Sequence, residues 1–387
     1  MTLAKAAAIV GVSPGTLGRW VRDGLIPQYL DEWTPAALGQ ARLVVRMRER
    51  GYTVAQIKAA TADGRLAFGP LTELFATGER TYSARQAASA ADLDAAIVVR
   101  LAGVLGLRPE DGFSEDDIQL FQYIAAVLDA GMPVDATLQL ARVYLNAMSQ
   151  VADAEVRLVH LFVHEPLMRS GGTSEEMAQE LLLLAGGTLP LASPLFDRLH
   201  QRMLAQFIEQ DVIGHMETEV GADQVDIGRM RVAIAFADLT GYTRLTEEEG
   251  ELAALDIVEK FTESVLVTLP DDARVIKTIG DEVMVIGGDP VALTEWAVGF
   301  QQLHNEPPLP RIAVHYGYAL YRDGDYYGRE VNLASRVAAR SAGGEVLVTR
   351  PIVEAVGHDL AFEHLADIRL KGFAEATELF TARPAPE

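Results

Sequence analysis

The spacing of hydrophobic residues divides the chain into a helical first half and a β-rich remainder. Residues 1–75 carry helical patterns that are interrupted at Gly11, Gly24 and Gly51, and residues 82–217 are helical in pattern almost throughout. From Arg231 onward, short apolar runs typical of strands alternate with helical patterns. These runs are Val232–Phe236, Arg274–Lys277, Glu282–Ile286, Arg311–His315 and Glu345–Thr349. The pattern predicts an α+β protein whose helical half precedes a sheet.

The same patterns set the expected domain boundaries. We expect a first helical unit at residues 1–75 and a second at 76–195. A connecting helix and linker follow at 196–228, and the sheet-containing domain occupies 229–387. The linker is placed at Gly221–Gly228, because this glycine-containing stretch follows a long helical pattern.

The two helical units resemble diverged copies of each other. Four segments of the first unit recur at an offset of about 80 residues, which is the mark of a duplication. The pairs are Leu3-Ala-Lys-Ala-Ala-Ala with Ser83-Ala-Arg-Gln-Ala-Ala, Gly24-Leu-Ile-Pro with Gly106-Leu-Arg-Pro, Trp33-Thr-Pro-Ala-Ala-Leu with Phe113-Ser-Glu-Asp-Asp-Ile, and Met47-Arg-Glu-Arg-Gly with Val127-Leu-Asp-Ala-Gly. Alanine-rich helices also match one another by chance, so the duplication is a hypothesis for the structure to test.

A helix-turn-helix pattern opens the first unit. A short helix ends at Gly11, Ser13 and Pro14 are typical of a helix start, and Arg19 and Arg22 lie on the helix that follows. Over about 60 residues the pattern is similar to the MerR-type winged helix-turn-helix, which implies DNA binding as one alternative. Residues 1–65 carry nine Lys or Arg and five Asp or Glu, whereas residues 83–142 carry four and nine. We favour a packing and regulatory role, because the unit is joined to an acidic body.

Composition narrows the classes of function. The 387 residues carry a net charge of −22, which disfavours binding of nucleic acid or anionic lipid over the surface as a whole. The absence of cysteine excludes disulfides, thiolate metal sites and cysteine nucleophiles, and it fits a reducing compartment. The most apolar stretch, Leu181–Phe196, is interrupted by two glycines and two prolines and is shorter than the ~20 residues of a membrane span. We therefore expect a cytoplasmic protein without a membrane span.

Two aspartates accompany strands in the C-terminal region. Asp238 ends an apolar run and precedes Thr240 and Gly241, where free backbone N–H groups at a helix start suit a polyphosphate. Asp281 lies with Gly280 at the turn of a predicted hairpin. Each aspartate alone also fits a helix cap or turn. If the two strands are neighbours, however, both carboxylates reach one point and can hold two Mg²⁺ ions.

Further polar residues follow downstream. Asn332 and Arg336 are four residues apart and therefore share one face of a predicted helix. An asparagine amide can orient a ribose, and an arginine can neutralise charge that develops on a phosphate. Lys371 offers another cation, next to the turn residue Gly372.

Taken together, these motifs closely resemble the class III nucleotidyl cyclases over about residues 228–382. The matching strings, in family order, are Phe-Ala-Asp-Leu-Thr-Gly-Tyr-Thr, Lys-Thr-Ile-Gly-Asp-Glu-Val-Met, Gly-Arg-Glu-Val-Asn-Leu-Ala-Ser-Arg and Leu-Lys-Gly. The N-terminal part is similar, more loosely, to mycobacterial pH-sensing adenylyl cyclases with an autoinhibitory helical domain. The resemblance implies a ferredoxin-like catalytic domain that works as a head-to-tail homodimer.

The resemblance also implies how the site is divided. Asp238 and Asp281 bind two Mg²⁺ or Mn²⁺ ions. Lys277 and Asp325 read adenine, whose ring nitrogen accepts and whose amino group donates a hydrogen bond, so ATP is preferred over GTP.

Asn332, Arg336 and Lys371 complete the implied site. Asn332 positions the ribose, Arg336 stabilises the pentavalent α-phosphate, and Lys371 contacts the triphosphate. The implied reaction is in-line attack of the 3′-hydroxyl on the α-phosphorus, giving 3′,5′-cyclic AMP and pyrophosphate. The alternative is a MerR-like DNA-binding regulator whose cyclase-like domain only senses nucleotide. A diguanylate cyclase is disfavoured, because a proline and a valine follow Gly287-Gly-Asp where that family has glutamate and phenylalanine.

His215 is the candidate regulatory residue. It lies among Glu209, Asp211 and Glu217, and nearby carboxylates favour the charged imidazole. One hypothesis is therefore control by pH through the connecting helix, and another is control by a lipid in the apolar interior of the helical half. The plain alternative is that His215 is a solvated surface residue.

Overall fold

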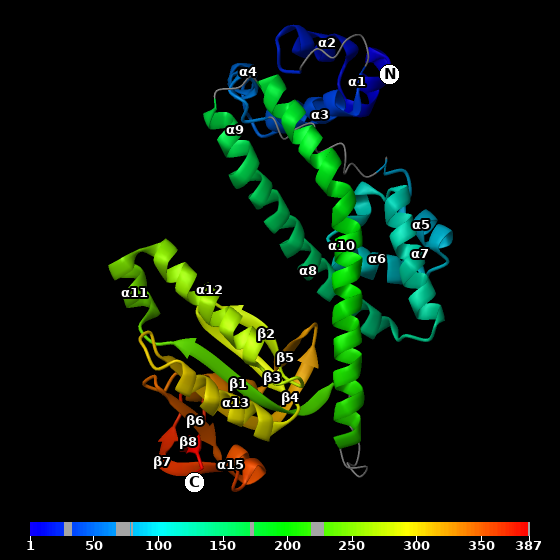
Figure 1. Ribbon diagram of the computed structural model, residues 1–387. Coiled ribbons are helices and arrows are strands. Elements are labelled where there is room, and N and C mark those ends of the chain that lie inside the picture. The colour runs from blue at the N-terminus through cyan, green and yellow to red at the C-terminus, as the bar shows by residue number, and fades with distance from the viewer. Residues whose placement is uncertain (27–32, 67–77, 79, 171–173, 218–227, 386–387) are drawn as a thin grey trace. The chain divides into compact units, whose positions relative to one another are not determined.

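The computed structural model describes residues 1–26, 33–66, 78, 80–170, 174–217 and 228–385. They form two compact units, Met1–Gln201 and Arg202–Glu387. The first unit is helical and the second contains an eight-stranded sheet (Figure 1), so the predicted order of a helical half and a mixed sheet is confirmed. The finer boundaries near residues 75, 195 and 228 stay predictions.

The first unit contains two similar groups of four helices. The first group is α1 (Leu3–Val10), α2 (Pro14–Arg22), α3 (Pro35–Glu49) and α4 (Val54–Ala62). The second is α5 (Ala84–Ala91), α6 (Ala95–Val104), α7 (Glu115–Asp129) and α8 (Val134–Val159). Each helix of the second group begins 80 or 81 residues after its counterpart, and a short turn of 3₁₀ helix, Pro109–Asp111, precedes α7.

Backbone pairing supports the duplication as well. Met1 and Trp33 exchange two N–H···O bonds, of 3.2 and 3.3 Å, just outside α1 and α3. Tyr82 and Phe113 exchange the equivalent bonds, of 3.1 and 2.8 Å, just outside α5 and α7. Each group also encloses its own hydrophobic core.

The start of α2 is as the sequence predicts. Ser13 caps the helix by accepting a hydrogen bond of 3.0 Å from the backbone of Thr16, and Pro14 is the first helical residue. A serine cap followed by proline is favoured because the cap satisfies a free donor and proline lacks one. The MerR-type resemblance itself stays a prediction.

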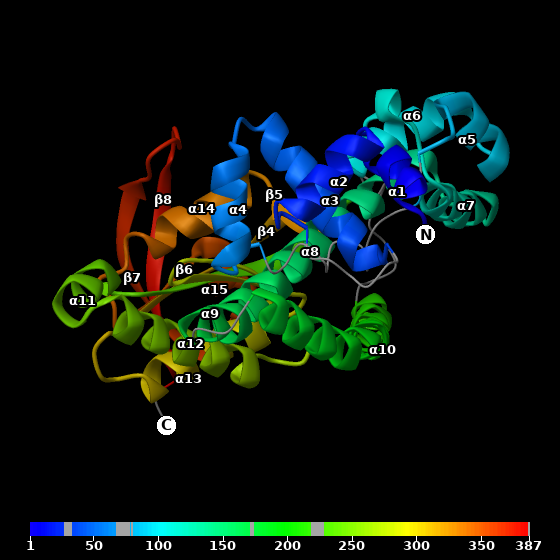
Figure 2. The ribbon, with the colours of Figure 1, turned by 90° about the horizontal axis from the view of Figure 1, so that it is seen from above.

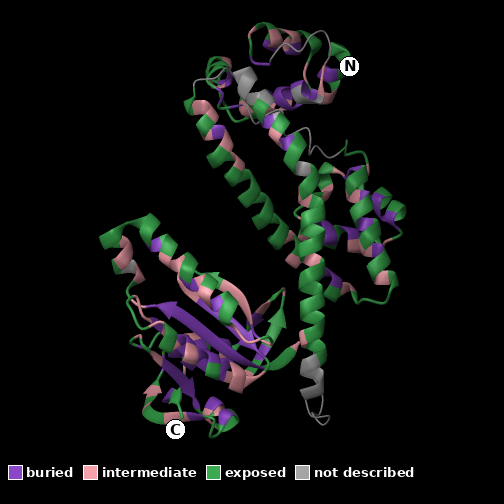
Figure 3. Ribbon diagram, viewed as in Figure 1, coloured by how far each residue is buried: buried purple, intermediate pink, exposed green. Residues whose placement is uncertain are grey.

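A long helix follows the second group. After α8 the chain passes through a π-helical turn, His160–His164, and α9 (Glu165–Arg169), and then forms α10 (Ser174–Glu217). The helical pattern predicted for residues 82–217 agrees with this helix, and α10 continues through Pro190 and Pro194. Many of its apolar side chains are exposed (Figure 3). None of the helices within the described residues has the length and hydrophobicity needed to cross a membrane.

The second unit is built on one mixed sheet. Its strands are β1 (Arg229–Leu239), β2 (Arg274–Ile279), β3 (Glu282–Gly287), β4 (Pro310–Arg322), β5 (Asp325–Tyr327), β6 (Glu345–Thr349), β7 (Leu360–Arg369) and β8 (Ala376–Pro384). Seven strands lie in the order β2-β3-β1-β4-β6-β8-β7, and β5 pairs with β4. The β4–β6 pair is parallel and the other pairs are antiparallel.

Helices cover both faces of this sheet (Figure 2). The connecting helices are α11 (Tyr242–Glu249), α12 (Glu251–Thr268), α13 (Pro290–Leu303), α14 (Arg329–Ala338) and α15 (Arg350–Val356). Alternate residues of β1 belong to different cores: Val232, Ile234 and Phe236 pack with α14, and the alanines between them pack with α12 and α13. Burial on both faces explains why the β1 sequence is a continuous apolar run.

Candidate active site

The two predicted metal-binding aspartates lie at the same end of two neighbouring strands of the sheet. Strands β1 and β3 are antiparallel neighbours in which Ala237 pairs with Val283. Asp238 is therefore at the end of β1, beside the residues that begin β3. Asp281 immediately precedes β3 in the predicted two-residue turn, where Gly280 adopts φ 66°. The register thus brings both carboxylates to the same place.

Arg311 holds the first of these carboxylates. It is the cross-strand partner of Asp238 on β4, and its Nε donates a hydrogen bond of 2.7 Å to Asp238 Oδ2, with Nη2 donating to the same oxygen. The other oxygen, Oδ1, is buried and has no donor. A single guanidinium therefore satisfies only half of a buried carboxylate.

The neighbouring acids make the site more negative than one arginine can balance. Burial, followed by the neighbouring carboxylate of Asp238 and its negative charge, raises the pKa of Asp281 to about 7. Two ionised carboxylates this close repel each other, so the pair favours a proton on Asp281. Burial and the charge of Asp238 also raise the pKa of Glu282. An orphaned carboxylate oxygen beside a proton-retaining carboxyl group fits a hard divalent cation.

Thr240 does not offer the free donors that we expected. Its backbone N–H and its hydroxyl both donate to the carbonyl of Leu309, each at 2.9 Å. It also fills the space beside Gly343, where an added Cβ would lie 2.5 Å from Thr240 Cγ2. The prediction of phosphate contact by Thr240 is therefore wrong in this geometry, because the side chain joins two loops instead. Gly241, at φ 77°, begins α11 without a side-chain cap, so its assignment stays a prediction.

Lys277 and Asp325 are brought together as predicted. Lys277 Nζ donates to Asp325 Oδ2 from β2, just after a register shift that follows Val275. Asp325 begins β5, and its other oxygen accepts a hydrogen bond of 2.8 Å from the backbone of Tyr326. The lysine also lies 5.9 Å from the ring centre of Tyr327. A donor and an acceptor are thus held side by side, which suits an adenine edge.

A separate pocket of about 390 Å³ gathers the remaining predicted residues. Its lining is Arg329, Asn332, Arg336, Lys371, Gly372 and Phe373. Asn332 and Arg336 are exposed on one face of α14, while the opposite face is buried against the sheet. Neither Asp238 nor Asp281 is among the described residues that line this pocket. One chain therefore presents two groups of site residues, a carboxylate group and a cationic group.

Sequence reasoning missed Arg311 and Glu282. Arg311 is the single charged residue at the head of the run Arg311-Ile-Ala-Val, which is the signal that could have marked it. Its role depends on pairing with a strand 73 residues away, and periodicity does not reveal such a pairing. His215 lies within α10, but its side chain falls outside what the structure describes.

Comparisons with known proteins indicate a family for the chain as a whole. The family of the adenylate cyclase regulatory domain matches residues 28–207. A pH-sensitive adenylate cyclase of Mycobacterium tuberculosis is 28% identical over 368 residues, covering 89% of this chain and 88% of the relative. The chain is therefore similar to adenylate cyclases over most of its length and to the adenylate cyclase regulatory domain in its helical half. An adenylate cyclase of Streptomyces coelicolor is 28% identical over 73% of the chain and 74% of its own length.

One solved structure that is similar to part of the chain is also an adenylyl cyclase. The adenylyl cyclase CyaB of P. aeruginosa aligns with 41% of this chain and 96% of its own, at 22% identity and a TM-score of 0.38.

Proposed function

We propose that the chain converts ATP into 3′,5′-cyclic AMP and pyrophosphate. The observation that carries the proposal is that Asp238 and Asp281 lie at the same end of two neighbouring strands, and that Oδ1 of Asp238 is buried without a hydrogen-bond partner. The relationship to adenylate cyclases along 89% of the chain supports the choice of reaction.

Asp238 and Asp281 are the proposed ligands of two Mg²⁺ or Mn²⁺ ions. Such ions would activate the ribose 3′-hydroxyl and neutralise the triphosphate. Arg311 donates to Oδ2 of Asp238 and so holds that carboxylate in place.

The Lys277–Asp325 pair and the residues of the Asn332 pocket are proposed to bind and orient the nucleotide. Lys277 and Asp325 read the adenine edge, and their mutual hydrogen bond keeps them ready to do so. Asn332 holds the ribose, Arg336 stabilises charge on the α-phosphate during in-line attack, and Lys371 contacts the phosphates that leave as pyrophosphate.

The separation of the two groups supports a head-to-tail homodimer. In that arrangement the carboxylates of one subunit face the Asn332 pocket of its partner, and symmetry gives two equivalent sites. A complete site then requires two chains, so activity depends on how the catalytic domains meet.

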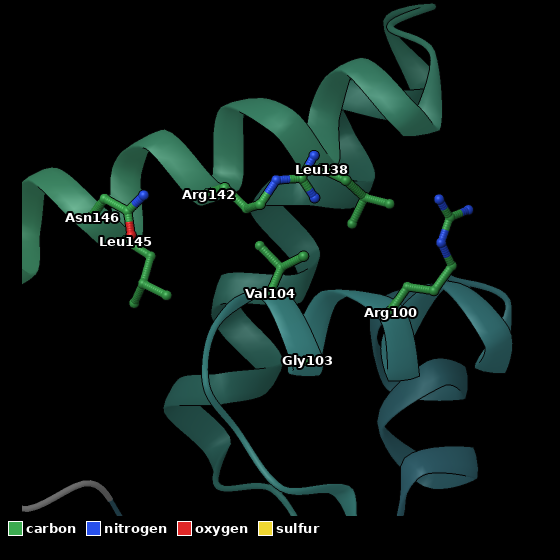
Figure 4. Close-up of a pocket in the computed structure, with 7 residues that line it drawn as sticks. All are labelled: Arg100, Gly103, Val104, Leu138, Arg142, Leu145 and Asn146. Carbon is green, nitrogen blue, oxygen red and sulfur yellow. The ribbon is translucent and has the colours of Figure 1, made fainter. Parts of the chain in front are cut away.

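The helical half is proposed to regulate the association of the two catalytic domains, in response to pH or to a lipid. A pocket of about 460 Å³ lies between α6 and α8 (Figure 4). Val104, Leu138 and Leu145 give it an apolar wall, and Arg100 and Arg142 add positive charge. Arg100 also pairs with Asp135, 2.6 Å away. This lining is suited to an anionic amphiphile, which makes it the place to seek the lipid. His215 remains the proposed pH-responsive residue.

DNA binding by the first unit is the second candidate. Arg19 and Arg22 are exposed on α2, the helix that would enter a major groove in a helix-turn-helix. The acidic remainder of the chain disfavours it.

The test is cyclic AMP formation by the purified full-length chain, with ATP and Mn²⁺. We expect formation that Asp238→Ala and Asp281→Ala each lower by several orders of magnitude, because each removes a metal ligand. Retention of more than about a tenth of the rate by either variant would contradict the assignment. Nucleotide binding without turnover would instead favour the DNA-binding regulator.

A further inference from the structure

A buried polar network lies beneath the helix that carries Asn332 and Arg336. His315, on β4, is 3% exposed. Its Nε2 lies 2.8 Å from Glu330 Oε2 in the first turn of α14, and its Nδ1 lies 2.7 Å from Thr349 Oγ1. The histidine thereby connects the central sheet to α14 on one side and to the end of β6 on the other.

The hydrogen-bonding roles in this network follow from the carboxylate. The hydrogen bond from His315 lowers the pKa of Glu330 and outweighs the opposing effect of burial. An ionised carboxylate only accepts, so Nε2 of His315 is assigned as the donor to Glu330, while Nδ1 shares a hydrogen bond with the Thr349 hydroxyl. Thr349 is the first residue before α15, yet its side chain caps no backbone group there. Its hydroxyl is committed to His315.

The start of α14 depends on this contact. The helix follows Gly328 and has no side-chain cap, so Glu330 is the acidic residue that interacts with its N-terminal dipole. The apolar side chains Val331, Leu333 and Ala334 hold the helix against the sheet, but apolar contacts are non-directional. The hydrogen bond between Glu330 and His315 is directional, so it restricts rotation and sliding of α14 against the sheet.

Gly317 reserves the space for the pair. A Cβ at this position would lie 2.8 Å from His315 Nε2 and 3.0 Å from Glu330 Cγ. Alanine would therefore push the two side chains apart even though it removes neither of them. The close approach of sheet and helix at this point requires glycine.

We propose that His315 is a positioning residue that acts through Glu330 to set α14, and thereby the placement of Asn332 and Arg336 in the active site. The inference rests on the proposed cyclase function. Asn332 and Arg336 are exposed and make no part of the network themselves, so a displaced helix moves both together. A misplacement of about 1 Å costs up to about a hundredfold in rate.

The experiment compares Glu330→Ala, Glu330→Gln and Glu330→Met in the full-length chain. Alanine and methionine remove the acceptor, and we expect each to lower kcat about tenfold to a hundredfold with little change in KM for ATP. Glutamine keeps an acceptor oxygen and should retain kcat within about threefold. Methionine fills the space of the glutamate, so it serves if the alanine variant does not fold. Gly317→Ala should reproduce the loss.

Glu378→Ala is the matched control. Glu378 also joins a strand to a helix, by accepting a hydrogen bond of 2.9 Å from Arg350 Nε, but the helix concerned is α15 and not α14. We expect its kcat to be unchanged. Equal losses of kcat in Glu378→Ala and Glu330→Met, or a methionine variant as active as the wild type, would overturn the proposal.

A double-mutant cycle separates positioning from general stability. If Glu330 acts through α14, its truncation should cost less in an Arg336→Ala background than in the wild type, because the group it positions is gone. Equal losses in both backgrounds would contradict positioning. Amide exchange of α14 should be faster in Glu330→Met than in the wild type, and unchanged exchange would also overturn the proposal. This readout does not need turnover, so a wild-type chain that forms no cyclic AMP would contradict the proposed function alone.

Discussion

Metal affinity should depend on pH through Asp281. Its pKa of about 7 means that a divalent ion must displace a proton at neutral pH, since only the carboxylate binds metal. Asp281 is about ten-elevenths protonated at pH 6 and about one-eleventh protonated at pH 8. The apparent Kd for the metal should therefore be about tenfold higher at pH 6 than at pH 8. An aspartate with its ordinary pKa near 3.9 would give almost no change over this range.

Calorimetry measures this effect directly. Titration of the full-length chain with Mn²⁺ in buffers of different ionisation enthalpy gives both the Kd and the number of protons released. We expect release of about 0.9 proton at pH 6, falling to about 0.1 at pH 8. Asp281→Asn should bind metal more weakly and release no proton from this site. A wild-type Kd that is the same at both pH values would refute the raised pKa.

The remaining predictions concern the shared site and the base. Mixing Asp238→Ala chains with Arg336→Ala chains should restore activity in heterodimers, because one of the two composite sites then has both groups intact. Cyclic AMP formation on mixing is measured against each variant alone, and no recovery would argue against the head-to-tail arrangement. Lys277→Glu combined with Asp325→Ser should lower kcat/KM for ATP far more than for GTP, because the donor and acceptor that match adenine are removed. Equal losses for both nucleotides in a competition assay would mean that these residues do not read the base.

The helical repeat was predictable because its signals are local. The helix start at Ser13 and Pro14 is encoded in adjacent residues, and the structure places it where the sequence indicates. The helical pattern also agrees with α10, although Pro190 and Pro194 favour a break on local grounds. Strand β7 was missed because half of its residues are exposed, so it lacks an apolar run.

The site residues also differ in whether the local sequence reveals them. Asp238, Asp281, Asn332 and Arg336 stand in recognisable strings, and the strand order then explains why the aspartates meet. Contacts across the sheet were not foreseen. His315 and Glu330 are 15 residues apart and on different kinds of element, and nothing in either local sequence marks the pair. Such residues become visible only once register and helix packing are known.

The expected titration of Asp281 and the proposed pH control by the helical half have opposite effects on activity. If Asp281 binds the metal as proposed, acidification from pH 8 to pH 6 should weaken metal binding by about tenfold, so the site alone should become less active at subsaturating metal. If control by pH through the helical half and His215 holds, activity of the full-length chain should instead rise over the same interval. The two effects oppose each other, and they can be separated by comparing the full-length chain with residues 220–387 at low and at saturating Mn²⁺. We expect the shorter chain to lose activity on acidification at low Mn²⁺ and to show a flat profile at saturation, while the full-length chain gains activity at saturation. Superimposable profiles at saturating Mn²⁺ would remove the helical half from pH control and leave a ligand of the α6–α8 pocket as the signal to test.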